Sequence, residues 1–133
     1  MTGTGCVLLA EDDLQVRETL ADLLEIDGFR VVTAANAEEA MEIIVTEPTA
    51  VRILVTDLSM PGEDGIALIQ RARRLRPGLP AILLTGLAEE PSCFAMQGGG
   101  FHVLRKPVLA DDLTQYINML TEHRDVCLPP STQ

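Results

Sequence analysis

The seven residues VRILVTD (51–57) decide the fold, because they form a short apolar run that ends in a carboxylate, Asp57. Three further apolar runs lie at 6–10, 81–84 and 102–104. Each of these also ends beside polar side chains, which are Glu11, Asp12 and Asp13, then Thr85, and finally Arg105 and Lys106. Such runs are typical of buried strands in a parallel sheet, and ligands bind at the carboxyl edge of such a sheet.

Segments with helical periodicity separate the apolar runs. We predict strands at 6–10, 30–34, 51–56, 81–85 and 101–105, and helices at 14–27, 36–47, 64–76, 91–97 and 109–123. This alternation predicts an α/β fold, a doubly wound (βα)5 three-layer sandwich with a parallel sheet in the middle. Because right-handed crossovers place the carboxyl ends of all strands on one edge, the polar residues there should converge on one pocket.

The predicted helices carry recognisable ends. Asn36 followed by Glu39 indicates a helix start of the capping-box type, and Gly28 supplies a left-handed residue after the first helix. In the first helix Leu14, Leu20, Leu23, Leu24 and Ile26 recur at mostly helical spacing. In the second helix the apolar residues should face inward, and these are Ala40, Met41, Ile43 and Ile44. The third helix should leave its arginines mostly exposed, which are Arg71, Arg73, Arg74 and Arg76.

Composition indicates one acidic globular domain. The 133 residues are 47% hydrophobic and carry a net charge of −10, which argues against direct nucleic acid binding. No apolar run approaches the ~20 residues of a membrane span, and the first residues lack a signal-peptide pattern, so a cytoplasmic location is expected. We expect the domain at 1–125, a flexible tail at 126–133, and reduced thiols at Cys6, Cys93 and Cys127.

The pocket predicted at the sheet edge suits a hard divalent cation. Carboxylates packed together repel one another unless a cation joins them, and Mg²⁺ prefers oxygen ligands. Glu11, Asp12 and Asp57 offer such ligands. Lys106 could neutralise charge, and the Thr85 hydroxyl could bind a phosphoryl oxygen. Since aspartate can act as a nucleophile and form an acyl phosphate, this set favours phosphoryl transfer.

The chain resembles the receiver domains of two-component response regulators. The resemblance is carried by LLAEDD (8–13), LVTDLSMPG (54–62), LTG (84–86) and RKP (105–107). Each motif is weak by itself, but the four in this order and spacing are specific, and with the helices between them they cover residues 6 to about 123. The resemblance implies a flavodoxin-like (CheY-like) fold with strand order 2-1-3-4-5.

The resemblance also implies a role for each pocket residue. Asp57 would accept a phosphoryl group from a phosphohistidine of a sensor histidine kinase or a histidine phosphotransfer protein. Asp12, Asp57 and the main-chain carbonyl of Ser59 would bind Mg²⁺ directly, Glu11 would bind it mostly through water, and Mn²⁺ could replace it. Thr85 and Lys106 would contact the phosphoryl group, and the Lys106–Pro107 peptide bond would be cis.

By the same resemblance, the protein would be a phosphoacceptor signalling domain rather than an enzyme that turns over an external substrate. Its output face for a downstream protein would combine the fourth helix, the fifth strand and the fifth helix. The chain could be a stand-alone regulator or the receiver of a hybrid histidine kinase, and a homodimer remains open.

The chain departs from the family pattern at two positions. Many receivers carry Tyr or Phe three residues before the lysine, where this chain has Val103. Phe101 lies two residues earlier on the same strand face and could either replace that ring or only pack in the core. Leu87, two residues after Thr85, is bulky and should slow hydrolysis of the acyl phosphate.

Other interpretations stay open at this point. Asp12 could cap the following helix as readily as bind a cation, and Asp13 is best explained as a helix cap. A phosphatase of the haloacid dehalogenase type would need an aspartate where this chain has Ser59. A receiver-like interaction protein that is never phosphorylated is a third hypothesis, although all five pocket residues are present.

Overall fold

A computed structural model describes residues 6–47, 50–60, 62–86, 102–105 and 110–125. The strands are β1 (Cys6–Ala10), β2 (Val31–Ala34), β3 (Val51–Asp57), β4 (Ala81–Thr85) and β5 (His102–Arg105). The helices are α1 (Leu14–Ile26), α2 (Ala37–Thr46), α3 (Gly65–Leu75) and α5 (Ala110–Asp125). These elements confirm the predicted alternation, while the predicted helix at 91–97 lies outside the described residues.

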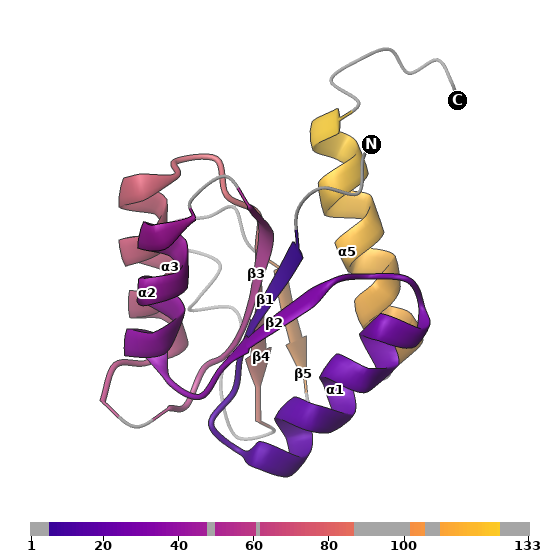
Figure 1. Cartoon of the computed structure of the whole chain (residues 1–133), viewed down its shortest axis with the longest axis horizontal. Helices are drawn as coiled ribbons and strands as arrows, with labels where there is room; N and C mark the ends of the chain where they lie inside the picture. Colours follow the sequence, from indigo (N-terminus) through magenta and orange to yellow (C-terminus); the bar gives the residue numbers. More distant parts are fainter. Residues whose placement is uncertain (1–5, 48–49, 61, 87–101, 106–109, 126–133) are drawn as a thin grey trace.

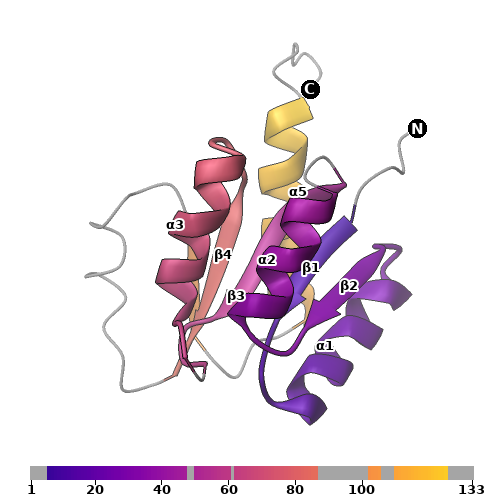
Figure 2. The ribbon, with the colours of Figure 1, turned by 60° about the vertical axis from the view of Figure 1, so that its left-hand side comes forward.

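The five strands form one parallel sheet in the order β2-β1-β3-β4-β5, which confirms the doubly wound fold. Helices α2 and α3 cover one face of the sheet, and α1 and α5 cover the other (Figure 1, Figure 2). Because consecutive strand residues point to opposite faces, the strands contribute side chains to two hydrophobic cores, one on each side of the sheet. Leu8, Leu54 and Leu83 pack toward α2 and α3. Leu9, Val55 and Leu84 pack toward α1 and α5.

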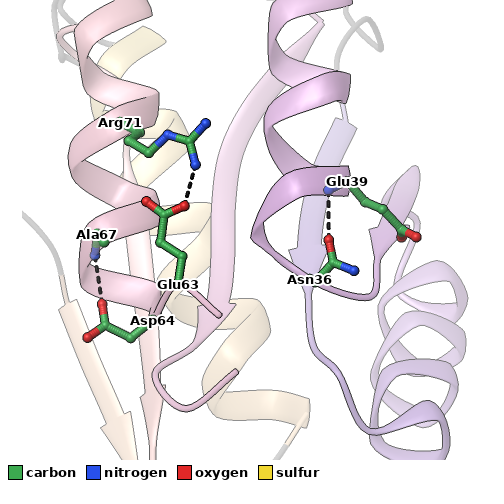
Figure 3. A network of polar contacts seen from close by, with 6 residues as sticks. All are labelled: Asn36, Glu39, Glu63, Asp64, Ala67 and Arg71. Atoms are coloured by element: carbon green, nitrogen blue, oxygen red, sulfur yellow. Dashed lines mark hydrogen bonds and ion pairs between the residues drawn. The ribbon is translucent and has the colours of Figure 1, made fainter. Parts of the chain in front are cut away.

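Polar side chains begin the helices where the sequence predicts. The Asn36 side chain accepts a hydrogen bond from the Glu39 backbone N–H at 2.9 Å, and Asp64 accepts one from Ala67 at 2.9 Å (Figure 3). The Glu39 carboxylate reaches back to the N–H of Ala35 at 2.8 Å, one residue before the position of a standard capping box. These bonds satisfy N–H groups that have no partner inside the helix.

The apolar residues of α1 are only partly buried, although they recur at mostly helical spacing. In α1 only Leu20 and Leu24 are buried, whereas Leu14, Leu23 and Ile26 are exposed. Val16 and Ala21 are partly buried and pack against the same core, so the contact face of α1 follows Val16, Leu20 and Leu24, which lie four residues apart.

The arginines of α3 are less exposed than predicted, because three of them bind nearby oxygens. Arg73 Nε donates to the carbonyl of Leu79 at 2.9 Å, and burial lowers the pKa of Arg73. Arg76 donates to the carbonyl of Val51, and Arg71 forms an ion pair with Glu63 (Figure 3). Only Arg74 of the four is exposed. The bonds of Arg76 and Arg73 connect the carboxyl end of α3 to the start of β3 and to the chain before β4.

Cys6 is buried in β1, and burial raises the pKa of its thiol. Cys6 is a free cysteine among the described residues, and Cys93 and Cys127 lie outside them. Among the described helices, none combines the length and the apolar character that crossing a bilayer requires.

Candidate metal centre

The acidic residues meet where β1 and β3 end side by side. The register of these parallel strands pairs Ala10 with Thr56, so Glu11 and Asp57 follow as neighbours at the carboxyl edge. Asp12 is the next residue after Glu11. One carboxylate oxygen from each of the three acids lies within 4.8 Å of those of the other two. The predicted acidic cluster is therefore present.

Burial of these carboxylates costs free energy unless a positive charge is bound beside them. Glu11 is 1% exposed and Asp57 is 5% exposed, while Asp12 is exposed at the rim. Ionised carboxylates lose hydration when buried and repel one another at this separation. Oxygens bound to one Mg²⁺ at about 2.1 Å lie no more than about 4.2 Å apart, so small side-chain rotations would bring the acids into one shell. The all-oxygen donor set thus fits a hard divalent cation.

The structure separates the roles of the adjacent acids Asp12 and Asp13. Asp13 is the N-cap of α1, and its Oδ1 accepts the N–H groups of Gln15 at 3.0 Å and Val16 at 3.2 Å. The capping role is therefore taken by Asp13, as predicted, and Asp12 belongs to the acidic cluster instead. Glu11 supports this turn, because its Oε2 accepts the N–H of Asp13 at 3.1 Å.

Substitutions at these two neighbours should have opposite effects. Asp13→Ala is expected to lower the free energy of unfolding by about 1 kcal/mol, because α1 loses its cap, while Mg²⁺ affinity changes little. Asp12→Asn is expected to leave stability unchanged or raise it, because one of three repelling charges is removed, and to weaken Mg²⁺ binding strongly. Urea unfolding and a Mg²⁺ titration would distinguish them, and the same pattern for both variants would contradict the assignment.

Thr85 ends β4 beside the acidic cluster. Its neighbour Leu84 pairs with Asp57 in the sheet, and the Leu84 carbonyl accepts the N–H of Leu58 at 2.8 Å. Thr85 is fully buried, and its hydroxyl has no hydrogen-bond partner within the part of the chain that the structure describes. A buried hydroxyl without a partner is unfavourable, so this group is ready to donate to an oxygen that arrives at the site.

Gly65, the first residue of α3, was missed by sequence reasoning. A Cβ at this position would lie 2.3 Å from the main-chain oxygen of Asp57 and 2.9 Å from Cδ1 of Leu83. The Gly65 N–H donates to the carbonyl of Leu58 at 2.9 Å, so α3 begins directly against the end of β3. A glycine in the first turn of a predicted helix runs against helix propensity, and this was the available signal.

Other predicted residues are placed less completely. Ser59 is exposed two residues after Asp57. Val103 is half-buried and pairs with Leu83 in the sheet, so it occupies the face of β5 that looks toward α2 and α3. Lys106, Pro107, Phe101 and Leu87 lie outside the described residues. The structure therefore brings the three acids together beside Thr85, and the predicted approach of Lys106 remains a prediction.

The fold and the site together define a class of protein. It is a doubly wound α/β domain whose β1 and β3 end in an acidic cluster suited to a cation, with a hydroxyl-bearing residue at the end of β4. The chain belongs to the family of response regulator receiver domains, whose family model matches residues 7–118. This confirms the family and the fold that the four sequence motifs implied.

Individual relatives agree with this assignment. The chain is 35% identical to the C4-dicarboxylate transport transcriptional regulatory protein DctD of Rhizobium meliloti over 125 residues, which are 93% of this chain and 27% of DctD. It is thus similar to about a quarter of DctD. A receiver domain structure from Clostridium thermocellum has a TM-score of 0.86 at 30% identity, with 93% of this chain and 99% of that chain covered. The receiver domain of the hybrid histidine kinase CckA has a TM-score of 0.74 at 28% identity, with 88% of this chain and 99% of that chain covered.

Proposed function

We propose that Asp57 is the phosphoacceptor of a phosphorelay and takes its phosphoryl group from a phosphohistidine on a sensor kinase or phosphotransfer protein. The observation that supports this most directly is the position of Asp57 within a receiver-family domain. Its carboxylate ends the central strand β3 and lies within 4.8 Å of the carboxylates of Glu11 and Asp12. A capping aspartate would not need two further acids beside it.

In the proposed step, an Asp57 carboxylate oxygen attacks the phosphorus of the donor. The new P–O bond forms as the P–N bond to imidazole breaks, the electron pair of that bond stays on the imidazole nitrogen, and this nitrogen takes up a proton from solvent. Asp12, Asp57 and the Ser59 carbonyl would hold Mg²⁺ directly, with Glu11 acting mostly through water, and Mn²⁺ could replace it. When bound, the cation offsets the negative charge shared by the phosphoryl oxygens and the acids.

Thr85 and Lys106 would carry the signal away from Asp57. The Thr85 hydroxyl, which has no partner in the described structure, would donate to a phosphoryl oxygen, and Lys106 would supply a positive charge. Because phosphate then favours the conformation in which Thr85 has moved inward, it would shift an equilibrium between two states. The output face would consist of 91–97, β5 and α5, where a downstream protein binds.

The receiver would span residues 1–125, with a tail at 126–133, and it would work in the cytoplasm, alone or within a longer regulator or hybrid kinase. It catalyses only its own phosphorylation and dephosphorylation. The net charge of −10 favours protein partners over direct contact with nucleic acid.

Incubation with acetyl phosphate and Mg²⁺, followed by intact mass spectrometry, tests this function. The expected result is a mass gain of one phosphoryl group that needs the cation and is absent in Asp57→Asn. No gain with any donor in the presence of Mg²⁺ would favour an interaction protein that is never phosphorylated. A gain that persists in Asp57→Asn would place the phosphate elsewhere.

A further inference from the structure

Arg17 binds the backbone of the acidic cluster rather than one of its carboxylates. This residue lies near the start of α1, and its Nη1 donates to the main-chain carbonyl of Glu11 at 2.9 Å. The bond joins α1 back to the last residue before the rim of the pocket. The Arg17 side chain is half-buried there rather than extended into solvent.

We propose that Arg17 is a positioning residue for the divalent cation, acting through the turn formed by Glu11, Asp12 and Asp13. The inference rests on the metal site of the proposed function, but it does not require that Asp57 be phosphorylated. Arg17 would not touch the cation. It would fix the backbone from which the Asp12 carboxylate projects.

Arg17 would fix the orientation of Asp12 through the peptide bond between Glu11 and Asp12. Because a peptide unit is planar, holding its carbonyl oxygen also holds the N–H and the Cα of Asp12. The Glu11 N–H is already bound to the carbonyl of Ala34 at 3.0 Å, so Arg17 secures the other backbone group of Glu11. The turn is closed on its other side by Glu11 Oε2, which accepts the Asp13 N–H.

Arg17 thus connects the body of α1 to this turn from outside it. Without this bond, the Glu11–Asp12 peptide could rotate, and Asp12 would lose part of its orientation toward Glu11 and Asp57. Groups that orient metal ligands in this way commonly change metal affinity 10–100-fold when they are removed.

The charge of Arg17 acts in the opposite direction. A guanidinium near three carboxylates competes electrostatically with a divalent cation, so removal of the charge alone should tighten Mg²⁺ binding. Loss of positioning should weaken it. The sign of the change therefore separates the two roles.

The test is a Mg²⁺ titration of the ¹⁵N-labelled full chain without phosphodonor, followed by NMR through the amide of Asp13. Arg17→Met keeps length and helix propensity but removes the donor and the charge. It should weaken Mg²⁺ binding about tenfold. Arg17→Lys, which keeps the charge and can still donate one bond, should fall between Arg17→Met and the unmodified protein. Arg74→Met makes the same change at an exposed site on α3 and should bind Mg²⁺ normally.

Mg²⁺ affinity that is unchanged or tighter in Arg17→Met would overturn the proposal. Circular dichroism at the titration temperature shows whether each variant is folded. If Arg17→Met fails to fold, Arg17→Lys decides, and affinity equal to that of the unmodified protein would refute the positioning role. A protein that binds Mg²⁺ but takes no phosphate on Asp57 would contradict only the proposed function.

Discussion

Gly65→Ala is expected to lower the free energy of unfolding by about 3 kcal/mol and to impair phosphoryl transfer to Asp57. The added Cβ would lie 2.3 Å from the main-chain oxygen of Asp57. That neighbour is backbone within the central strand, so it cannot move aside as a flexible side chain could. Either α3 withdraws, which breaks the bond from Gly65 N–H to Leu58, or the end of β3 shifts.

The effect can be measured by urea unfolding and by the rate of labelling with acetyl phosphate. Gly28→Ala is the matched control, because Gly28 has a positive φ of 100° but a Cβ added there would meet nothing within 4 Å. It should lose about 1 kcal/mol through backbone strain and label normally. If Gly65→Ala were as stable as the unmodified protein, the close approach of α3 to Asp57 would be wrong.

Thr85→Val is expected to make the unphosphorylated protein more stable by about 1 kcal/mol while it uncouples phosphorylation from the output face. Valine keeps the β-branched shape of threonine and removes a buried hydroxyl that lacks a partner in the described structure. Asp57 would still accept phosphate, because its acids and cation remain. The conformational response would be lost, since no hydroxyl binds the phosphoryl oxygen.

Thr56→Val provides a close comparison on the neighbouring strand. Thr56 is also fully buried, but its hydroxyl donates to the main-chain oxygen of Asp57 at 3.0 Å. Its replacement should lower the free energy of unfolding by about 1 kcal/mol, the opposite sign to Thr85→Val. In both variants, the changes in the NMR chemical shifts of β5 and α5 on phosphorylation would measure the coupling between Asp57 and the output face. Destabilisation of similar size in both variants would show that the Thr85 hydroxyl has a partner after all.

Local patterns predicted the elements well for physical reasons. Apolar runs predicted β1, β3 and β4 because strands buried on both faces have no polar side to interrupt them. Asp13 and Asn36 marked helix starts because capping involves only residues two or three positions away. The carboxyl edge followed from topology, since parallel strands with right-handed crossovers all end on one side.

Predictions that needed exact packing were less successful. Ile26 is 78% exposed although it fits the helical apolar pattern, because periodicity does not tell how wide a face the sheet will cover. Arg73 and Arg76 are partly buried because backbone oxygens lie within their reach, which charge alone does not reveal. Gly65 escaped notice because its neighbours are brought to it only when β3, β4 and α3 have packed.

The amino-acid sequence by itself determined the order of strands and helices, the acids and the hydroxyl at the strand ends, and the family to which they point. These properties depend on residues close along the chain or on a rule of topology. Only the tertiary structure decided that Asp12 joins Glu11 and Asp57 within 4.8 Å, and that Arg17 holds the Glu11 carbonyl. Those contacts join atoms from different parts of the fold, so the packing of the folded chain sets their distances.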